Sequence, residues 1–200
     1  MKAAIFMAIA LVASSWTAFS DELSFRNALK TLPPKYLGDI PLADREEFLK
    51  EVGSDGERLD AAKGWLHWYT DGGDVGGTSM VWAKELPRPG KKPLVFVHMA
   101  KPFAEAVHSK PAANQTFVLE RVGKDWVDVT KTVIPSIVDM TMHFRTRKQD
   151  TVIEVAPWKE FERRDGRGKA WTYGEKAMDL RWTGKQFVVK KASTKELTKN

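Results

Sequence analysis

The sequence contains no cysteine, which excludes disulfides, a cysteine nucleophile and a lipid anchor on a cysteine after an N-terminal leader. Stability must therefore come from packing of the core. An exported chain without disulfides fits a bacterial periplasm or the exterior of the cell. The residues best able to fill the core are tryptophans, seven of which lie after residue 20: Trp65, Trp68, Trp82, Trp126, Trp158, Trp171 and Trp182.

Long apolar runs are missing after the first twenty residues. Those twenty residues combine one lysine, a short apolar stretch and the small-residue end Ala18-Phe19-Ser20, which predicts a secretory signal peptide over 1–20 that is removed before Asp21. No later stretch approaches the roughly 20 apolar residues of a membrane-spanning helix. We therefore expect a periplasmic or secreted protein without a transmembrane segment, in which residues 21–200 form a single domain.

The short motifs of several common enzyme classes are absent. There is no Gly-x-Ser-x-Gly nucleophile elbow and no His-Glu-x-x-His zinc motif. The glycine-rich stretch over 71–78 lacks the Lys-Ser/Thr of a P-loop and the ligand alternation of an EF-hand, so we interpret it as a flexible connection between strands. These absences predict no metal site and no cofactor.

The four histidines lie far apart along the chain. Strand alternation could still bring His67, His98 and His143 onto neighbouring strands. We favour the interpretation that these histidines are structural residues whose ring nitrogens are hydrogen-bonded. The alternative is a catalytic site in which histidine and carboxylate residues converge from separate strands.

Two short helices are expected before the β-rich part. Apolar residues recur at helical spacing over about 22–31, and Pro33-Pro34 prevent continuation of that helix. A second helix is expected over about 41–51, because Pro41 suits a first turn and Gly53 suits a stop.

From Gly64 onward the apolar pattern becomes that of strands. The run Leu94-Val95-Phe96-Val97 is so apolar that we expect a central strand covered on both faces. The predicted fold is α+β and mainly β: an antiparallel meander of eight or nine strands, as a sandwich or curled sheet, after the two helices. The expected strands are 64–69, 78–85, 93–100, two within 115–130, 140–146, 151–156 and two within 176–191.

Two of the predicted hairpins are built on Gly-Lys turns. In the last one, a two-residue Gly184-Lys185 loop gathers five apolar side chains on one face: Met178, Leu180, Trp182, Phe187 and Val189. The earlier hairpin turns at Gly123-Lys124. A two-residue loop there pairs Leu119 with Asp128, whereas a three-residue loop gathers more apolar residues, so its register stays open.

Positive charge is concentrated in the C-terminal third. The whole chain has a formal charge of +6, and residues 140–200 hold fifteen Lys and Arg against eight Asp and Glu. Within this part, the segment 158–173 interleaves aromatic rings with basic side chains that can bind carboxylate, phosphate or sugar groups. The alternative is a solvated connection whose aromatic rings pack under the sheet. The candidate binding residues are Trp158, Arg163, Arg164, Arg167, Lys169 and Trp171.

Several different short motifs lie along the chain between the N-terminal helices and the last hairpin: Leu32-Pro33-Pro34-Lys35-Tyr36, Arg45-Glu46, Gly64-Trp65-Leu66, Trp126-x-Asp128-Val129-Thr130 with Pro135, and Leu180-Arg181-Trp182-Thr183-Gly184-Lys185-x-Phe187. Together they resemble a loose class of small exported bacterial β-meander proteins of unknown function. The resemblance spans most of the chain after residue 20. It implies a signal peptide, an N-terminal helical part and a β-meander, and it brings no catalytic residues.

These observations favour binding over catalysis. We expect an exported soluble binding or accessory protein that contacts an anionic envelope polymer or an acidic protein surface, and export argues against nucleic acid as a partner. The alternative is a small exported hydrolase. A histidine beside a carboxylate in a polar cleft would favour the hydrolase, and a shallow aromatic and basic surface would favour binding.

Overall fold

The computed structural model describes residues 25–37, 43, 45–49, 59–70, 78–103, 114–162 and 169–191. Of residues 47–48, 69–70, 78–79, 101–103, 161–162 and 169–172 it describes only the backbone. Several predictions fall outside the described residues: the signal peptide over 1–20 with its cleavage site, the glycine-rich connection over 71–77, and the three residues Arg163, Arg164 and Arg167.

The N-terminal part contains short helical elements. Residues 25–31 are helical, followed by the 3-10 helix η1 (Pro34–Tyr36) and the α-helix α2 (Arg45–Phe48). The first helix ends before Pro33, because proline cannot donate the next helical hydrogen bond. Both α-helical stretches lie within the ranges predicted from the sequence.

Strands make up most of the remaining described chain, which confirms the predicted mainly-β α+β class. A 3-10 turn, η3 (Ala61–Lys63), and a short helix, α4 (Thr130–Val133), interrupt them. The strands are β1 (Leu59–Asp60), β2 (Trp65–Thr70), β3 (Thr78–Arg88), β4 (Lys91–Phe103), β5 (Gln115–Val122), β6 (Asp125–Asp128), β7 (His143–Thr146), β8 (Val152–Ala156), β9 (Trp158–Glu162), β10 (Lys169–Tyr173), β11 (Met178–Trp182) and β12 (Phe187–Lys191).

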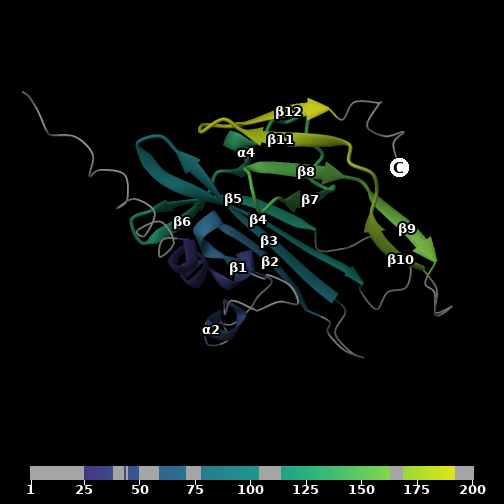
Figure 1. Ribbon diagram of the computed structural model, residues 1–200, viewed down its shortest axis with the longest axis horizontal. Coiled ribbons are helices and arrows are strands. Elements are labelled where there is room, and N and C mark those ends of the chain that lie inside the picture. Colours follow the sequence, from purple (N-terminus) through teal and green to yellow (C-terminus); the bar gives the residue numbers. More distant parts are fainter. Residues whose placement is uncertain are drawn as a thin grey trace, which may run out of the picture.

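The strands form three antiparallel units. β1 to β6 make a six-stranded sheet in chain order, and β12, β11, β8 and β7 make a four-stranded sheet in that order. β9 and β10 pair with each other as a two-stranded ribbon. The four-stranded sheet lies across the six-stranded sheet, and the ribbon lies at one end of the molecule (Figure 1). The sequence did not predict β1 or the ribbon.

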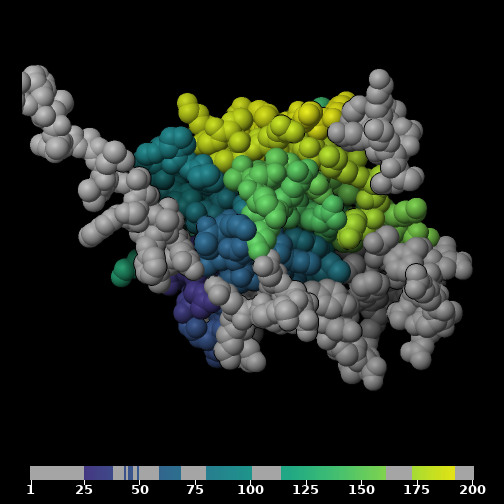
Figure 2. Space-filling model, in the orientation of Figure 1, coloured from purple at the N-terminus to yellow at the C-terminus, as the bar shows by residue number. Residues whose placement is uncertain are grey.

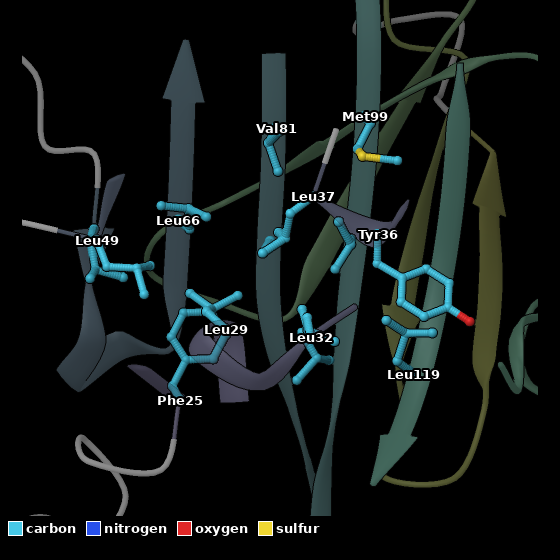
Figure 3. Close-up of a cluster of buried hydrophobic side chains, with 14 of the residues drawn as sticks. Phe25, Leu29, Leu32, Tyr36, Leu37, Leu49, Leu66, Val81, Met99 and Leu119 are labelled. Atoms are coloured by element: carbon cyan, nitrogen blue, oxygen red, sulfur yellow. The ribbon is translucent and has the colours of Figure 1, made fainter. Parts of the chain in front are cut away.

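One core lies between the N-terminal helical segment and one face of the six-stranded sheet (Figure 3). Phe25, Leu29 and Leu32 are spaced three or four residues apart, so they lie on one side of this segment, and each is fully buried. They pack with buried residues from four consecutive strands: Leu66, Val81, Val97 and Leu119. The helical segment therefore covers the sheet face that does not meet the second sheet.

A second core fills the space between the two sheets. β4 contributes Leu94 and Phe96 to it, whereas the alternating residues Val95 and Val97 belong to the first core. The Phe96 ring centroid lies 6.3 Å from that of Phe144 on β7 and 6.4 Å from that of Phe187 on β12. The expectation that this strand is central and covered on both faces is confirmed.

Both Gly-Lys turns have two-residue loops. In the last hairpin Trp182 pairs with Phe187, and the five apolar residues predicted to share a face all belong to the second core or pack against it. In the earlier hairpin Leu119 pairs with Asp128. This is the register of a two-residue loop, which the sequence had left undecided. Gly123 has φ 63°, which a two-residue turn requires and an alanine would not readily adopt.

Replacing Gly64 by alanine is expected to lower the free energy of unfolding by about 2 kcal/mol or more. Gly64 follows η3 with φ 53°, and an added Cβ would lie 2.5 Å from Cβ of Glu85 on β3. Gly123→Ala is the matched control, because it has a similar φ of 63° but no atom within 4 Å of an added Cβ. Urea unfolding of both variants measures the difference, and equal losses would show that the close approach of Gly64 to β3 costs nothing.

Candidate functional site

A row of side chains crosses the face of the six-stranded sheet that meets the second sheet. The strand register pairs His67 with Trp82, Trp82 with His98, and His98 with Thr116, on β2, β3, β4 and β5. Directly paired residues lie on the same face of a sheet, so these four side chains are neighbours. The rings of His67 and Trp82 stack, with centroids 4.9 Å apart and planes 13° from parallel.

His143 of β7 reaches this row from the four-stranded sheet. Its Nδ1 lies 3.2 Å from Nε2 of His98, whose Nδ1 lies 2.8 Å from Oγ1 of Thr116. Both histidines are buried, with His98 at 0% and His143 at 1% exposure. The contact therefore joins the two sheets through two imidazole rings in a nearly water-free interior.

Burial keeps the histidines neutral. It lowers the pKa of His98 well below its ordinary value of 6.5, with the neighbouring His143 as a second cause. Burial, followed by the positive charge of Arg145 and by His67, lowers the pKa of His143 to about 3. The pKa of His67 is lowered by the same burial and by Arg145. At neutral pH each ring consequently carries a single N–H group.

The hydrogen-bond pattern assigns the position of each proton. The backbone N–H of Phe144 donates to Nε2 of His98 at 3.3 Å, so this nitrogen is an acceptor and the ring proton is on Nδ1, facing Thr116. His143 must then donate its own Nδ1 proton to Nε2 of His98. Nε2 of His143 is left with a lone pair, as a hydrogen-bond acceptor.

Aromatic rings surround His143. Its ring centroid lies 4.7 Å from that of Trp82, 4.8 Å from that of Trp158 and 5.3 Å from that of Tyr173, with the Tyr173 ring nearly parallel at 14°. Trp158 and Tyr173 are paired directly across the β9–β10 ribbon, so they share one face of it. The guanidinium carbon of Arg145 lies 5.1 Å from the centroid of the Tyr173 ring. The ribbon is thereby held against β7 by cation-π and ring contacts.

We call the resulting group the histidine–aromatic cluster. Four of its ring nitrogens are buried and have no hydrogen-bond partner among the described residues: Nε1 of Trp65, Nε2 of His67, Nε2 of His143 and Nε1 of Trp158. Buried polar atoms in proteins are nearly always hydrogen-bonded, either to other protein groups or to ordered water. The members of the cluster are Trp65, His67, Trp82, His98, His143, Trp158 and Tyr173.

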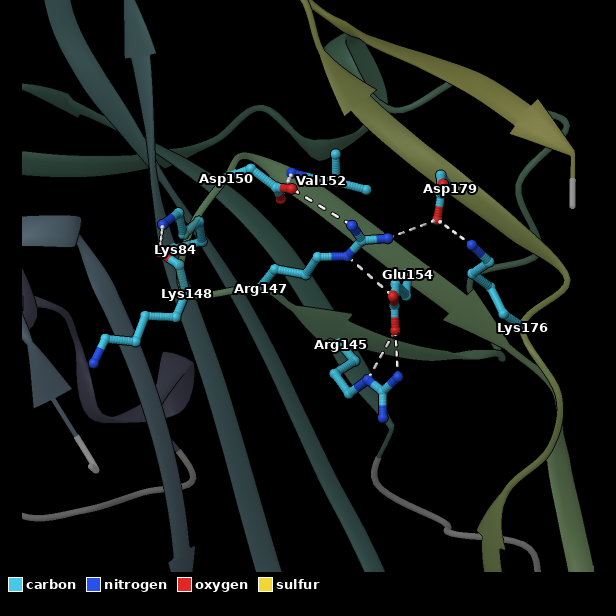
Figure 4. A network of polar contacts seen from close by, with 9 residues as sticks. All are labelled: Lys84, Arg145, Arg147, Lys148, Asp150, Val152, Glu154, Lys176 and Asp179. Atoms are coloured by element: carbon cyan, nitrogen blue, oxygen red, sulfur yellow. Dashed lines mark hydrogen bonds and ion pairs between the residues drawn. The ribbon is translucent and has the colours of Figure 1, made fainter. Parts of the chain in front are cut away.

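A charged network borders the cluster on the outer side of the four-stranded sheet (Figure 4). Arg145 and Arg147 both donate to the carboxylate of Glu154, and Arg147 also lies 3.7 Å from Asp179. Burial raises the pKa of Glu154, but its hydrogen bonds with Arg145 and the charges of Arg145 and Arg147 outweigh this and leave the pKa below its ordinary value. The network fixes Arg145 beside Tyr173.

The structure describes the candidate residues predicted from the sequence to different extents. Trp158 belongs to the histidine–aromatic cluster. For Lys169 and Trp171 the structure gives only backbone positions on β10, where Trp171 pairs with Glu160. Arg163, Arg164 and Arg167 lie outside the described residues, so the predicted basic contact stays a prediction.

Sequence reasoning missed several residues of the site. Tyr173 was noted only as an aromatic residue of the segment 158–173 and not as a candidate binding residue. Arg145 was not singled out, and Trp82 and Thr116 were read only as parts of strands. The available signal was the spacing of His67, Trp82, His98 and Thr116 within four predicted strands, but only the register shows that they are opposite one another. The satisfied structural role predicted for the histidines holds for both nitrogens of His98 and fails for Nε2 of His67 and of His143.

Tyr173 is the exposed member of the cluster, whereas Trp82, His98 and His143 are buried. Among the described residues, no carboxylate forms a hydrogen bond or ion pair with His67, His98 or His143. The same part of the chain holds no group of three or more histidine, cysteine or acidic residues arranged for a metal ion. The histidine–aromatic cluster contains ring faces, two N–H donors and a neutral acceptor, and a guanidinium group lies nearby.

No helix in the described ranges has both the length and the apolar character to cross a membrane. Comparison of the whole chain with protein-family models, with curated proteins and with solved structures gave no match.

Proposed function

We propose that this protein is an exported, non-catalytic binding domain whose ligand is an anionic polymer of the cell envelope. The observation that carries the proposal is the position of Tyr173. This ring is 45% exposed, stacks on His143 and lies under the guanidinium group of Arg145. An exposed aromatic ring next to a fixed arginine suits a ligand that combines a flat or apolar surface with negative charge.

The charge distribution supports an anionic ligand. The strands of the ribbon that carries Trp158 and Tyr173 are connected by residues 163–168, which contain Arg163, Arg164 and Arg167. Charges this close in sequence act together, because the Debye length is about 8 Å at physiological salt. The basic connection joins the Glu162 and Lys169 ends of the two strands, whereas Trp158 and Tyr173 pair at the other end of the ribbon.

The rival hydrolase function has less support. It needs a carboxylate beside a histidine to orient the ring and stabilise its charged form. In the described part of the chain the positive charge of Arg145 lowers the pKa of His143 and of His67, after the larger effect of burial, and so disfavours an imidazolium ion. A general base with a pKa of about 3 would also be weak at neutral pH.

Replacing Arg163, Arg164 and Arg167 together by serine is expected to weaken binding to an anionic polymer at least tenfold and to flatten its dependence on salt. The physical reason is the loss of three positive charges, which act mainly on the association rate. The measurement is stopped-flow or biosensor binding of polygalacturonate at several salt concentrations. The unfolding free energy is expected to stay within about 1 kcal/mol of the unmodified protein.

The matched control removes the same charge at the opposite end of the molecule. Lys91, Lys92 and Lys185 are exposed, and the β3–β4 turn lies beside the β11–β12 turn, where a Cβ on Gly184 would be 3.1 Å from Pro89 (Figures 1 and 2). Their triple serine variant is expected to keep its affinity within about twofold, because distant charges are screened. Equal losses in both variants would mean that only net charge matters, and unchanged binding in the arginine variant would refute the proposed contact.

A further inference from the structure

We infer that the end of the molecule opposite the β9–β10 ribbon is a second binding surface, whose partner is the anionic face of a lipid bilayer. This inference goes beyond the proposed function and does not depend on the ligand of the ribbon. It is carried by three β-turns that meet at this end. Each contains a glycine with a positive φ that is followed directly by an exposed lysine: Gly90-Lys91, Gly123-Lys124 and Gly184-Lys185.

Contacts between the turns hold them together. In an antiparallel meander the β3–β4 and β5–β6 turns lie at the same end of the sheet, and the ion pair between Arg88 and Glu120, 2.8 Å long, joins the two hairpins. The β11–β12 turn comes from the second sheet, and Nε1 of Trp182 donates to the carbonyl oxygen of Pro87 at 2.6 Å. Turns from both sheets thus form one end of the molecule (Figures 1 and 2). We call this end the turn tip, which comprises residues 87–92, 120–125 and 182–186.

The turn tip is basic. It holds six Lys and Arg against two Asp and Glu. Of the two carboxylates, that of Glu120 is already paired with Arg88, and the other belongs to Asp125. The lysines are exposed, and in the described part of the chain no ion pair includes any of the four: Lys91, Lys92, Lys124 and Lys185. Their charge is therefore available to an anionic partner.

The shape and the apolar residues of the turn tip favour a bilayer over a soluble polymer. Each turn is the closed end of a hairpin, so a flat charged surface can contact several turns at once (Figure 1). Val122, next to Gly123, is 56% exposed, and Pro87 and Pro89 are exposed beside the lysines. Apolar side chains can enter the boundary between head groups and acyl chains, while flexible lysine stems extend to the phosphates. A soluble polyanion offers no such apolar layer.

Cosedimentation with vesicles tests the inference on the mature chain over 21–200, which lacks the apolar residues 1–20. The vesicles contain phosphatidylcholine either alone or mixed with phosphatidylglycerol. We expect binding to the anionic vesicles only, and weaker binding as the salt concentration rises. Each lysine near such a surface strengthens binding about fivefold, so the triple serine variant of Lys91, Lys92 and Lys185 is expected to bind at least twentyfold more weakly.

The matched control is the triple arginine-to-serine variant of the connection between β9 and β10. It removes the same charge from the other end of the molecule, so its affinity for anionic vesicles is expected to change less than about threefold. The two variants thus exchange roles between vesicles and polygalacturonate. Absence of binding to anionic vesicles, or equal losses in both variants, would overturn the inference and leave the proposed function intact. Poly-L-glutamate that bound the turn tip as tightly as the vesicles would overturn the choice of a bilayer.

Replacing Val122 by serine tests the apolar contact without changing charge. We expect binding to anionic vesicles to weaken about three- to fivefold and binding to poly-L-glutamate to stay unchanged. Val127→Ser is the control, because Val127 is 45% exposed on the same hairpin but pairs with Glu120, farther from the turn than the pair of Val122 with Asp125. With thermal melts showing that both variants fold, equal affinity of the two for anionic vesicles would overturn the apolar contact.

Discussion

Lowering the pH from 7 to 5 is expected to reduce the free energy of unfolding by about 2 kcal/mol through His143, and His98 acts in the same direction. Both rings are buried and neutral in the folded protein, where burial lowers the pKa of His143 to about 3 and that of His98 well below 6.5. In the unfolded chain each titrates near 6.5. Below that value the unfolded chain binds more protons than the folded one, so acid favours unfolding.

The magnitude follows from linkage. With a folded-state pKa of about 3, His143 changes the unfolding free energy by about 1.4 kcal/mol per pH unit once the pH lies below 6.5, or about 2 kcal/mol between pH 7 and 5. His67 acts in the same direction but is only partly buried. Carboxylates with a lowered pKa, such as Glu154, lose their stabilising effect only as the pH falls below about 4.5, outside this window.

Urea unfolding at half-unit steps of pH measures this dependence. The His143→Asn variant is the control, because it removes one of the two rings; its slope between pH 5 and 6 is expected to fall by about 1.4 kcal/mol per pH unit, whatever its stability at pH 7. A flat stability between pH 7 and 5 in the unmodified protein would show that the two rings are accessible and titrate normally.

Replacing Phe96 by alanine is expected to cost about 3–5 kcal/mol, enough to lower the melting temperature by roughly 10 °C. Phe96 is fully buried between the two sheets and its ring lies near those of Phe144 and Phe187. Truncation leaves a cavity that Phe144 and Phe187, which both belong to the facing four-stranded sheet, cannot fill without moving the two sheets together.

The matched control is Val127→Ala. Val127 lies on the edge strand β6 and is 45% exposed, so its truncation is expected to cost less than about 0.5–1 kcal/mol. Thermal and urea unfolding of both variants give the comparison. A cost below about 1 kcal/mol for Phe96→Ala would mean that the two sheets are not held together by this ring.

Local sequence signals predicted much of the fold because they report short-range physics. The apolar alternation of β4, the Gly-Lys turns and the helix-terminating Pro33-Pro34 each act over a few residues, and each agrees with the structure. The β9–β10 ribbon was missed because two consecutive charged residues, Lys159 and Glu160, separate the rings of β9, so its apolar residues do not alternate as in a typical strand. A ribbon that buries only a few rings gives a weak apolar period.

The candidate site was harder to predict, because its residues meet only through long-range pairing. His98 and His143 are separated by 45 positions, and they come from different sheets. Their contact depends on the register of β3, β4 and β5 and on the crossing of two sheets, none of which is encoded in local spacing. Trp158 was predicted as a candidate binding residue from its basic and aromatic sequence neighbourhood, and its role in binding stays a prediction.

The alternation along β4 also determines how the molecule opens. Val95 and Val97 complete one core, and Leu94 and Phe96 complete the other, so neither core persists once this strand is lost. If the N-terminal helical segment moves away, it exposes one face of β4, and the other face of this strand holds the two sheets together. Backbone amides at the centre of β4 should therefore exchange with solvent only through global unfolding, and the two layers behave as one cooperative unit.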